Sequence, residues 1–386
     1  MIRFLALIFY LCCILSCKSQ TPIGIIKGAD QITEVAAKLK GKKVGLVVNH
    51  TALVGKTHLA DTLKSLGVNI IRIFGPEHGF RGDAADGEHV NDSIDTKTKI
   101  PVVSLYGKNR KPTSQQLTNL DVIVFDIQDV GARFYTYIGT LHYVMEACAE
   151  NNKNLLVLDR PNPNSYVDGP ILQPEFKSFV GMHPVPITHG MTIGEFSLMI
   201  NGEGWLDGGK KCNLDIVQLK NWTHADDYSL PVKPSPNLPN DQAVRLYPSL
   251  CLFEGTAISL GRGTTFPFLV LGNPEFKNVD GMTFTFTPTD IKGMAIDPPH
   301  KNQLCYGIDL RKAPVERRVN LQYLLDFYKI YPDKDKFFIK SFDRLAGGAI
   351  LRQQIIDGLT EAQIRDSWNE GLAAFSAIRK KYLLYP

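Results

Sequence analysis

The segment Gly75-Pro76-Glu77-His78-Gly79-Phe80-Arg81-Gly82 carries the densest group of side chains in this chain that could perform acid–base chemistry. It follows an apolar run that is typical of a β-strand, and its proline and glycines let the backbone approach a ligand closely. Glu77 could act as a general acid, held partly out of water by Phe80. The alternative is a loop ion pair between Glu77 and Arg81. We favour catalysis, because loop carboxylates at such a sheet edge are often functional, and predict that His78 and Arg81 contact the substrate.

A second carboxylate, Glu88, occurs in the sequence Asp86-Gly87-Glu88-His89 of the same long loop. Paired carboxylates suit glycoside hydrolysis, where one protonates the leaving oxygen and the other acts as a base or a nucleophile. A solvated loop charge is an equally good interpretation of Glu88. The sequence does not give the distance between the two carboxyl groups, so retaining and inverting mechanisms both stay open.

The stretch from Asp126 to Tyr137 combines aromatic rings with carboxylate, amide and guanidinium groups. A sugar site needs this combination, because rings stack on the sugar and polar groups form bidentate hydrogen bonds with it. We predict that Asp126 is catalytic, since it ends a strand. For Asp129 and Arg133, a buried salt bridge that shapes the loop is as good an interpretation as substrate binding. The predicted substrate contacts from this stretch are Gln128, Asp129, Arg133, Tyr135 and Tyr137.

Three further polar candidates follow two other apolar runs, and a fourth lies in a turn of the C-terminal half. Asn49 and His50 follow the first run, and Asn162 follows the fourth. Arg262, in Gly261-Arg262-Gly263-Thr264-Thr265, could reach an anionic group across a cleft. An exposed turn arginine is the alternative. We predict all four as substrate contacts.

The sequence does not predict a metal or a cofactor. His50, His78 and His89 match no common spacing of metal ligands. Gly55-Lys56-Thr57 lacks the earlier glycine of a phosphate-binding loop, and no dinucleotide-binding fingerprint follows the first strand.

The elements that must position these residues are apolar runs separated by helical stretches. Nearly continuous apolar runs are typical of strands in a parallel sheet that is covered on both faces. The carboxyl ends of such strands share one edge, where ligands bind, so residues far apart in sequence should meet in one polar cleft. The predicted strands are 44–48, 70–74, 122–125 and 155–158, and the predicted helices are 30–40, 57–66, 140–151 and 192–202. The fold class is therefore α/β, with Glu195 in the capping box of the last of these helices.

At 386 residues the chain exceeds the usual size of a single core, which predicts two domains. Four prolines between residues 231 and 239 mark the predicted boundary. We assign residues 18–233 to the catalytic domain and residues 234–386 to a smaller α+β auxiliary domain that completes the cleft. The auxiliary domain has predicted strands at 283–287 and 304–310, helices at 321–331 and 350–359, a helix opening at Thr360, and an amphipathic end at 369–384 that should pack on it.

The N-terminus is predicted to be a targeting segment. Arg3 precedes an apolar stretch from Phe4 to Leu15 that is too short to span a bilayer. Ile14-Leu15-Ser16-Cys17 resembles a bacterial lipobox, so we predict a signal peptide over residues 1–17 and lipidation of Cys17. The mature protein would then be an exported lipoprotein, anchored at the periplasmic or outer-membrane face. An ordinary cleaved signal peptide is the alternative.

The composition of the chain argues against one class of partner, nucleic acid. The chain is 44% hydrophobic and 21% charged, which is ordinary for a globular protein, and a net charge of +4 without a basic block argues against nucleic acid. Oligomeric state is not determined by these features. We predict buried thiols at Cys148, Cys212, Cys251 and Cys305, with oxidation of two of them as the alternative in an exported protein.

Several motifs together resemble a known family. In addition to segments 75–82 and 126–137, they are Asn49-His50-Thr51, Asp159-Arg160-Pro161-Asn162-Pro163, Pro234-Ser235-Pro236-Asn237, Phe253-Glu254-Gly255-Thr256 and Gly261-Arg262-Gly263-Thr264-Thr265. In this order, and from about Ile26 to Leu384, they resemble the NamZ family of exo-β-N-acetylmuramidases. The resemblance implies a Rossmann-like catalytic domain, a smaller auxiliary domain and a cleft between them. It also implies release of terminal N-acetylmuramic acid from the non-reducing ends of peptidoglycan fragments, with Glu77 at the position of the family's catalytic glutamate. Leu260 stands where the family is often acidic, so no role transfers to that position.

The substrate that this resemblance implies constrains the site. N-acetylmuramic acid carries a lactyl carboxylate, so its site should contain a cation, for which Arg81, Arg133 and Arg262 are the candidates. Its 2-acetamido group could itself attack the anomeric carbon, a route that needs a supporting carboxylate. Our hypothesis is that Glu77 is the acid/base and that Asp126 or Glu88 is the assisting carboxylate.

Two other functions stay open at this point. The first is a different cell-wall hydrolase, such as an amidase or esterase, although the chain lacks a metal cluster and a Gly-x-Ser-x-Gly motif. The second is a lipid-anchored module that captures muropeptides without cleaving them. Carboxylates at strand ends favour catalysis.

Overall fold

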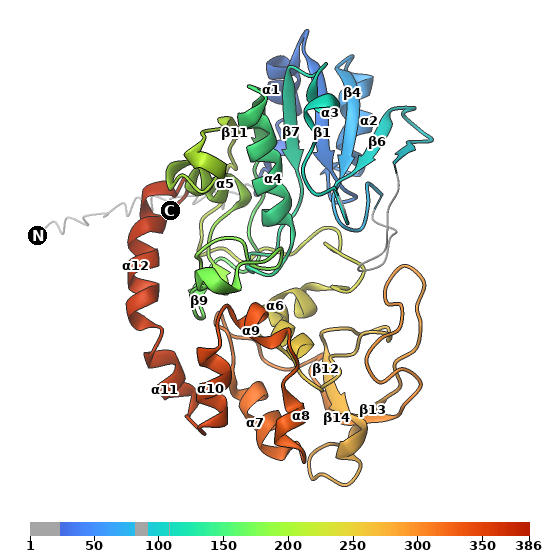
Figure 1. Ribbon diagram of the computed structural model, residues 1–386. Helices are drawn as coiled ribbons and strands as arrows, with labels where there is room; N and C mark the ends of the chain where they lie inside the picture. Colours follow the sequence, from blue (N-terminus) through green and yellow to red (C-terminus); the bar gives the residue numbers. More distant parts are fainter. Residues whose placement is uncertain (1–23, 82–91, 108) are drawn as a thin grey trace, which may run out of the picture.

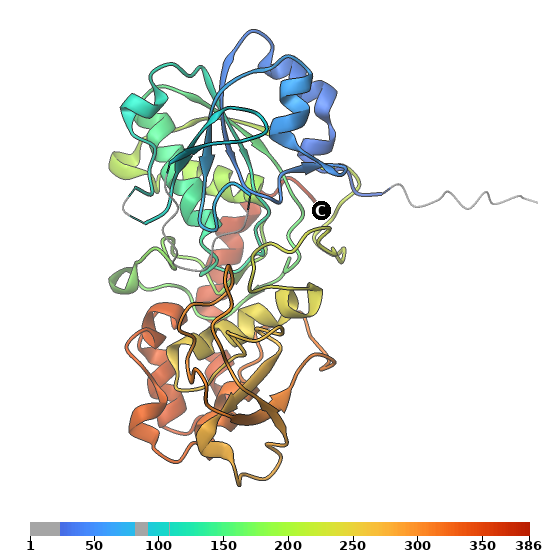
Figure 2. The same ribbon diagram turned by 90° about the vertical axis from the view of Figure 1, so that its right-hand side faces the viewer.

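The computed structural model describes residues 24–81, 92–107 and 109–386. They form two lobes, one around a large sheet and a smaller one of short strands and helices (Figures 1 and 2). The strands are β1 (Lys43–Val48), β2 (Leu53–Val54), β3 (Thr57–His58), β4 (Asn69–Gly75), β5 (Ser93–Ile94), β6 (Pro101–Ser104), β7 (Val122–Asp126), β8 (Asn154–Leu158), β9 (Val167–Asp168), β10 (Thr188–His189), β11 (Asn213–Val217), β12 (Val270–Asn273), β13 (Phe284–Phe286) and β14 (Cys305–Asp309). The helices are α1 (Ile32–Leu39), α2 (Leu59–Ser65), α3 (Ser114–Leu117), α4 (Tyr137–Glu150), α5 (Ile193–Gly202), α6 (Asp241–Leu250), α7 (Gln322–Ile330), α8 (Lys334–Phe337), α9 (Phe342–Ala346), α10 (Ile350–Ile356), α11 (Glu361–Asp366) and α12 (Asn369–Arg379).

The large sheet confirms the predicted parallel architecture. Its order is β11-β8-β7-β1-β4-β6-β5, and the strand pairs are parallel except for β5, which runs antiparallel to β6 at the edge. The four predicted strands are β1, β4, β7 and β8. The chain builds β4 and β6 on one side of β1 and then returns to build β7, β8 and β11 on the other. The topological switch point, where ligands bind in such sheets, therefore lies between β1 and β7.

Alternate side chains of the strands enter two separate core clusters. In β7, Ile123 and Phe125 pack in the cluster that contains α4 and α5. Val122 and Val124 pack in the cluster that contains α1 and α2. Side chains alternate between the faces of a strand, and here both faces are covered, which explains why the strands read as continuous apolar runs.

The helices of the large lobe agree with the prediction except at their ends. At α5, the Thr192 N–H donates to Glu195 Oε2 at 2.9 Å and the Glu195 N–H donates to Thr192 Oγ1 at 3.2 Å, which confirms the predicted capping box. The helix predicted over 57–66 begins only at Leu59, because Thr57 belongs to β3. His58 is its N-cap, and its Nδ1 accepts the N–H of Ala60 at 3.2 Å.

The smaller lobe has the predicted α+β character. Its antiparallel sheet has the order β12-β14-β13, in which β13 and β14 are the two predicted strands. Helices α7 and α10 lie within the predicted ranges, and Thr360 caps α11 with Gln363 in a capping box. The described part of the chain contains no helix long and apolar enough to cross a membrane. Cys148, Cys212, Cys251 and Cys305 are buried free thiols.

The prediction that the C-terminal stretch packs on the auxiliary domain is wrong for its last residues. Helix α12 runs along the side of the molecule and returns the chain end to the large lobe (Figure 1). There the Tyr385 hydroxyl donates to Asp159 Oδ2 at 2.6 Å and accepts the N–H of Leu219 at 2.9 Å. The buried carboxylate of Asp159 needs donors, and the tail supplies one of them.

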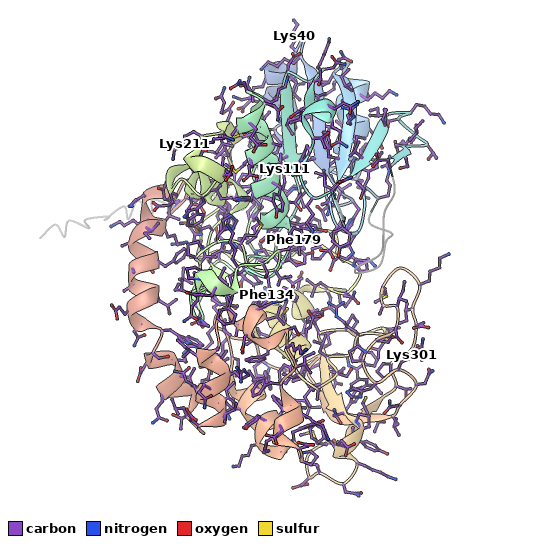
Figure 3. All side chains as sticks on the ribbon, viewed as in Figure 1. Lys40, Lys111, Phe134, Phe179, Lys211 and Lys301 are labelled. Carbon is purple, nitrogen blue, oxygen red and sulfur yellow. The ribbon has the colours of Figure 1, made fainter. Side chains whose placement is uncertain are left out.

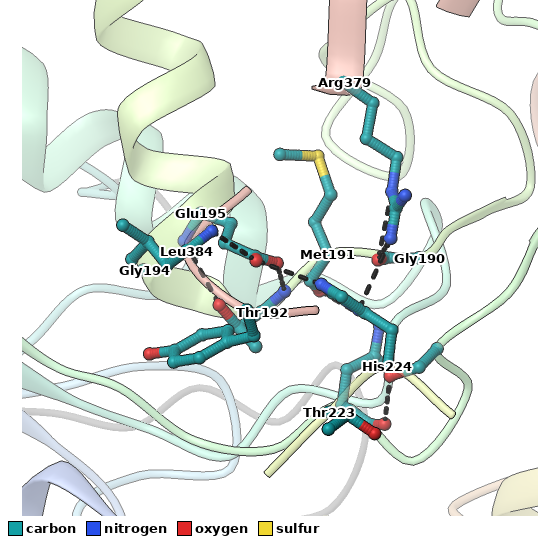
Figure 4. Close-up of polar contacts among 12 residues, drawn as sticks. Gly190, Met191, Thr192, Gly194, Glu195, Thr223, His224, Arg379 and Leu384 are labelled. Atoms are coloured by element: carbon teal, nitrogen blue, oxygen red, sulfur yellow. Dashed lines mark hydrogen bonds and ion pairs between the residues drawn. The ribbon is translucent and has the colours of Figure 1, made fainter. Parts of the chain in front are cut away.

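Glu195 is a second buried carboxylate that the tail satisfies (Figure 4). Its Oε1 accepts the N–H of Leu384 at 2.9 Å and lies 3.0 Å from His224 Nε2. Beside this group, Arg379 of α12 donates from Nε to the carbonyl of Gly190 at 3.1 Å. Glu195 therefore has the structural role predicted for it, and it also anchors the C-terminus.

Candidate active site

A pocket lies between the two lobes at the carboxyl edge of the large sheet. The lining residues are Glu77, His78, Phe134, Tyr135, Thr136, Tyr137, Val180, Ser235, Asn237, Leu238, Tyr247, Glu254, Arg262 and Phe268. Figure 3 labels Phe134 at the junction of the lobes. The fold thus brings together the predicted residues Glu77, His78, Tyr135, Tyr137 and Arg262.

Glu77 is held firmly in the loop that follows β4. It is only 8% exposed, and its Oε2 accepts a hydrogen bond from Thr136 Oγ1 at 2.6 Å. The loop turns tightly, because the Gly79 N–H donates to the Pro76 carbonyl at 2.9 Å and both His78 (φ 68°) and Gly79 (φ 75°) adopt left-handed backbone angles. A non-glycine residue in this conformation is strained, and such strain concentrates at functional sites. The carboxylate is therefore pre-positioned.

Aromatic rings form the wall of the pocket. Tyr135 packs edge-on against Tyr137 at 4.9 Å between ring centroids and against Tyr247 at 5.7 Å. Tyr247 in turn packs against Phe268 at 5.0 Å. Burial raises the pKa of Tyr135 and of Tyr137, so both phenols stay protonated at neutral pH. The wall offers stacking surface together with hydroxyl groups, as a sugar site requires.

These rings line the same pocket as Glu77, whereas Phe80, the predicted shield, does not. The Phe80 ring lies in the core beside α2, 4.8 Å from the His58 ring and under the Arg81 guanidinium at 4.3 Å. The sequence placed Phe80 near Glu77, but the turn at Gly79 directs it away from the pocket lining.

Asn49 and His50 support the pocket without lining it. Asn49 Nδ2 donates to the Tyr137 hydroxyl at 2.9 Å, and Asn49 Oδ1 accepts the N–H of Thr51 at 3.0 Å. His50 Nε2 lies 2.8 Å from the carbonyl of Lys233 and so ties the end of β1 to the proline-rich connection. Asn49 therefore orients Tyr137, which lines the pocket. His50 fixes the proline-rich connection, which supplies other lining residues.

Gln128, Asp129 and Asn162 shape the loops behind the pocket. Gln128 Nε2 donates to the Pro161 carbonyl at 2.8 Å, and Asn162 Nδ2 donates to the Met191 carbonyl at 3.0 Å. Asp129 Oδ2 accepts the N–H of Gly131 at 2.6 Å, and burial raises the pKa of Asp129 to about 7. None of the three is among the pocket-lining residues.

Arg262 and Glu254 bring a cation and a second carboxylate into the pocket from the smaller lobe. Arg262 Nε donates to Glu254 Oε1 at 2.5 Å, and the guanidinium carbon lies 5.2 Å from the centroid of the Phe268 ring. The ion pair orients both groups. A carboxylate from each lobe thus lines the same pocket, as Glu77 and Glu254.

Asp126 does not take the place predicted for it beside Glu77. It is 0% exposed and forms a bidentate pair with Arg160, whose Nε lies 2.5 Å from Oδ1 and whose Nη2 lies 2.9 Å from Oδ2. Arg160 follows the neighbouring strand β8, so parallel pairing places the two residues side by side. A buried carboxylate needs such a partner, and this pair leaves Asp126 outside the pocket lining.

Two predicted substrate arginines are also engaged elsewhere. Arg81 Nη2 lies 2.9 Å from Asp95 Oδ1. Arg133 is 1% exposed, and its guanidinium donates to carbonyl oxygens of both lobes, namely those of Pro170, Val185, Leu345 and Ala346, at 2.8–2.9 Å. Burial lowers the pKa of Arg133 to about 9, at which it is still charged at neutral pH. Arg133 therefore joins the lobes and does not line the pocket.

Glu88 and Cys17 lie outside the described residues. The pocket residues that the sequence prediction missed are chiefly Thr136, Asn237, Tyr247 and Glu254. Glu254 and Asn237 occur in the motifs Phe253-Glu254-Gly255-Thr256 and Pro234-Ser235-Pro236-Asn237, which was the available signal. Within residues 24–81, 92–107 and 109–386, no three His, Cys, Asp or Glu side chains are grouped to bind a metal ion.

Two family models match the chain, and together they span almost all of it. The N-terminal model of exo-β-N-acetylmuramidase NamZ matches residues 44–242, and the C-terminal model matches residues 245–385. The chain belongs to the NamZ family. The pocket described above lies where the two matched parts meet, with Glu77 from the first and Glu254 from the second.

One sequence relative and two solved structures are similar to this chain over most of its length. The chain is 42% identical over 377 residues to the peptidoglycan β-N-acetylmuramidase NamZ of Bacillus subtilis (strain 168), which covers 90% of this chain and 88% of the relative. Two crystal structures of DUF1343 family proteins from Bacteroides fragilis NCTC 9343 share the fold. Their TM-scores are 0.87 and 0.78 at 45% and 31% identity, and each comparison covers 94% of this chain and 99% of the other.

Proposed function

We propose that the protein releases terminal β-N-acetylmuramic acid from the non-reducing ends of peptidoglycan fragments. The observation that carries this proposal is the position of Glu77, which Thr136 fixes in an aromatic-walled pocket. Glu254 lines the same pocket, and glycoside hydrolysis uses two carboxyl groups on either side of the scissile bond. The identity to a peptidoglycan β-N-acetylmuramidase supports the choice of substrate.

In this mechanism Glu77 is the acid/base. Its protonated carboxyl group donates a proton to the glycosidic oxygen as the bond to the anomeric carbon breaks, and the resulting carboxylate accepts a proton from the attacking water. The Thr136 hydroxyl holds Oε2, so Oε1 is the oxygen presented to the substrate. Glu254, from the other lobe, is the second carboxylate and stabilises the positive charge that develops at the anomeric carbon. It takes the assisting role first predicted for Asp126, which lies outside the pocket lining, whereas the same prediction for Glu88 is untested because Glu88 lies outside the described residues.

The function is tested by incubation with a chromogenic β-N-acetylmuramide and, separately, with the corresponding β-N-acetylglucosaminide. Release of the chromophore from the muramide alone is the expected result. Release from neither, together with saturable muropeptide binding, would instead establish a binding module. Release of peptide from a muropeptide without cleavage of either glycoside would establish an amidase.

Arg262 is proposed as the cation that binds the lactyl carboxylate, because it is the arginine that lines the pocket. N-acetylmuramic acid should therefore inhibit the Arg262→Met variant about 10–100-fold more weakly than it inhibits the wild type, since a hydrogen bond to a charged group contributes about 1.5–3 kcal/mol. Inhibition by N-acetylglucosamine, which lacks the lactyl group, should change much less. The measurement is the inhibition constant of each sugar.

The exposed Arg311, which pairs with Asp309 outside the pocket, supplies the control. Arg311→Met should leave both inhibition constants unchanged. If Arg262→Met weakened inhibition by both sugars equally, Arg262 would only orient Glu254, and the assignment of Arg262 to the lactyl carboxylate would be wrong.

We also propose that Cys17 is lipidated and anchors the mature protein at the periplasmic or outer-membrane face. The lipobox-like sequence Ile14-Leu15-Ser16-Cys17 supports this proposal. Cells that express the wild-type chain should incorporate labelled palmitate into the protein and retain it in the membrane fraction, whereas Cys17→Ala should lose both properties. Equal membrane retention of the two chains, without label, would contradict it.

A further inference from the structure

The proline-rich segment 231–239 is part of the pocket as well as the connection between the lobes. Its residues Ser235, Asn237 and Leu238 line the pocket. The segment is held in place from the large lobe, because the Tyr137 hydroxyl lies 3.3 Å from the Pro234 carbonyl and His50 Nε2 lies 2.8 Å from the Lys233 carbonyl. A wall fixed in this way can present a polar atom to a ligand at a defined position.

Asn237 has one hydrogen-bonding group in use and one without a partner. Its Nδ2 donates to the Met294 carbonyl at 2.8 Å, which fixes the orientation of the amide. The side chain is 3% exposed, and Oδ1 is a buried acceptor that has no hydrogen-bond partner within the described residues. Buried polar atoms are almost always paired, so an unpaired acceptor on a pocket wall indicates that a ligand donor completes it.

The chemistry around Asn237 selects the donor. A sugar hydroxyl has two acceptor lone pairs in addition to its proton, and Asn237 Oδ1, itself an acceptor, can pair only with the proton. An amide N–H brings one donor and no acceptor. An amide N–H, which brings a donor and no acceptor of its own, is thus the best match to the single buried acceptor that Asn237 presents on this wall.

We propose that Asn237 is the specificity-determining residue for the 2-acetamido group, with its Oδ1 accepting the acetamido N–H. This inference rests on the proposed glycosidase function and goes beyond it, because it names the residue that recognises the substituent at C2. Asn237 acts here by contact with the substrate and takes no part in proton transfer.

The test compares two chromogenic substrates that differ only at C2, the N-acetylmuramide and its analogue with a hydroxyl group in place of the acetamido group. The quantity measured is the ratio of their kcat/KM values. Asn237→Ala should lower this ratio by about tenfold, because only the acetamido substrate loses a bond. Asn237→Asp keeps an acceptor but loses the donor to Met294, so it should keep most of the ratio.

The control is Asn273→Ala, which removes a buried asparagine of the smaller lobe whose bonds all go to the protein. Asn273 Nδ2 donates to the Ala257 carbonyl at 2.7 Å, and Oδ1 accepts the N–H of Glu275 at 2.8 Å. This variant should affect both substrates equally. Thermal unfolding of each variant shows whether it folds, and should Asn237→Ala fail to fold, the ratio of Asn237→Asp together with that of Asn237→Ser replaces it.

The outcomes separate this inference from the proposed function. Failure of the wild type to cleave the N-acetylmuramide would defeat the proposed function itself. A cleaving wild type with an unchanged ratio in Asn237→Ala would defeat only the assignment of Asn237. If Asn237→Ala and Asn237→Asp lowered the ratio of kcat/KM values equally, the only role of Asn237 would be its hydrogen bond to the Met294 carbonyl. This result would also overturn the inference.

Discussion

Replacing Glu77 by glutamine should reduce kcat on a natural disaccharide substrate by about 10³-fold, within the usual range for loss of a general acid. Glutamine has the same size, and its amide oxygen can still accept the hydrogen bond from Thr136, so the pocket should keep its shape. It cannot supply an acidic proton to the leaving oxygen. The loss should be smaller on a nitrophenyl glycoside, since that leaving group needs less protonation. Turnover of both substrates is the measurement.

The contrast between the two substrates is what identifies an acid rather than a binding residue. Thr136→Val, which removes the hydroxyl partner and keeps the carboxylate, should have an intermediate effect. Glu275→Gln makes the same chemical change at an exposed glutamate outside the pocket and should retain full activity. Near-normal turnover of the disaccharide by Glu77→Gln would rule out the assignment.

Replacing Arg133 by methionine should lower the free energy of unfolding by about 4 kcal/mol. This value counts about 1 kcal/mol for each of the four carbonyl groups that lose their donor. Methionine fills a similar volume but donates no hydrogen bond, and the carbonyl groups stay buried. Two of them, at Leu345 and Ala346, end helix α9 of the smaller lobe, so the loss also loosens the contact between the lobes.

Denaturant unfolding of the wild type and the variant measures this effect. Arg133→Lys should restore only part of the stability, because an ammonium group cannot reproduce the planar set of donors. Arg311→Met, at an exposed arginine that pairs with Asp309 and lies over the Phe266 and Phe284 rings, should lower the stability by clearly less than Arg133→Met does. A stable Arg133→Met protein with impaired substrate binding would return Arg133 to the substrate-contact role first predicted for it.

The large sheet could be predicted from the sequence because its strands are buried on both faces. In β7, Val122 and Val124 pack in one apolar cluster, and Ile123 and Phe125 pack in the other. Because both faces are buried, the strand is a continuous apolar run that can be recognised in the sequence. The capping box of Thr192 and Glu195 was equally visible, because it depends on residues three positions apart. Strands β6 and β11 were missed, since β6 has only four residues and opens on Pro101, and β11 has exposed residues within it, so neither forms a long continuous apolar run.

The partners of charged residues could not be predicted in the same way. Asp126, Arg81 and Arg133 all have side chains suited to a sugar site, and each is instead bonded to a residue distant in sequence. Arg133, for example, reaches Leu345, which is 212 positions away. A buried charge accepts whichever partner the fold brings within hydrogen-bonding distance, and no local pattern specifies that partner.

By itself, the sequence determined the parallel sheet, the strand ends from which the pocket loops start, and the candidate acid Glu77, because burial and capping leave local patterns of residues. Only the tertiary structure decided the second half of the site. It brought Glu254 from the other lobe and Asn237 from the connecting segment into the pocket that contains Glu77 and the predicted Arg262, and it carried the C-terminal tail back to the large lobe. The physical reason is that these positions follow from the packing of two lobes against each other, which depends on contacts between residues far apart in the chain.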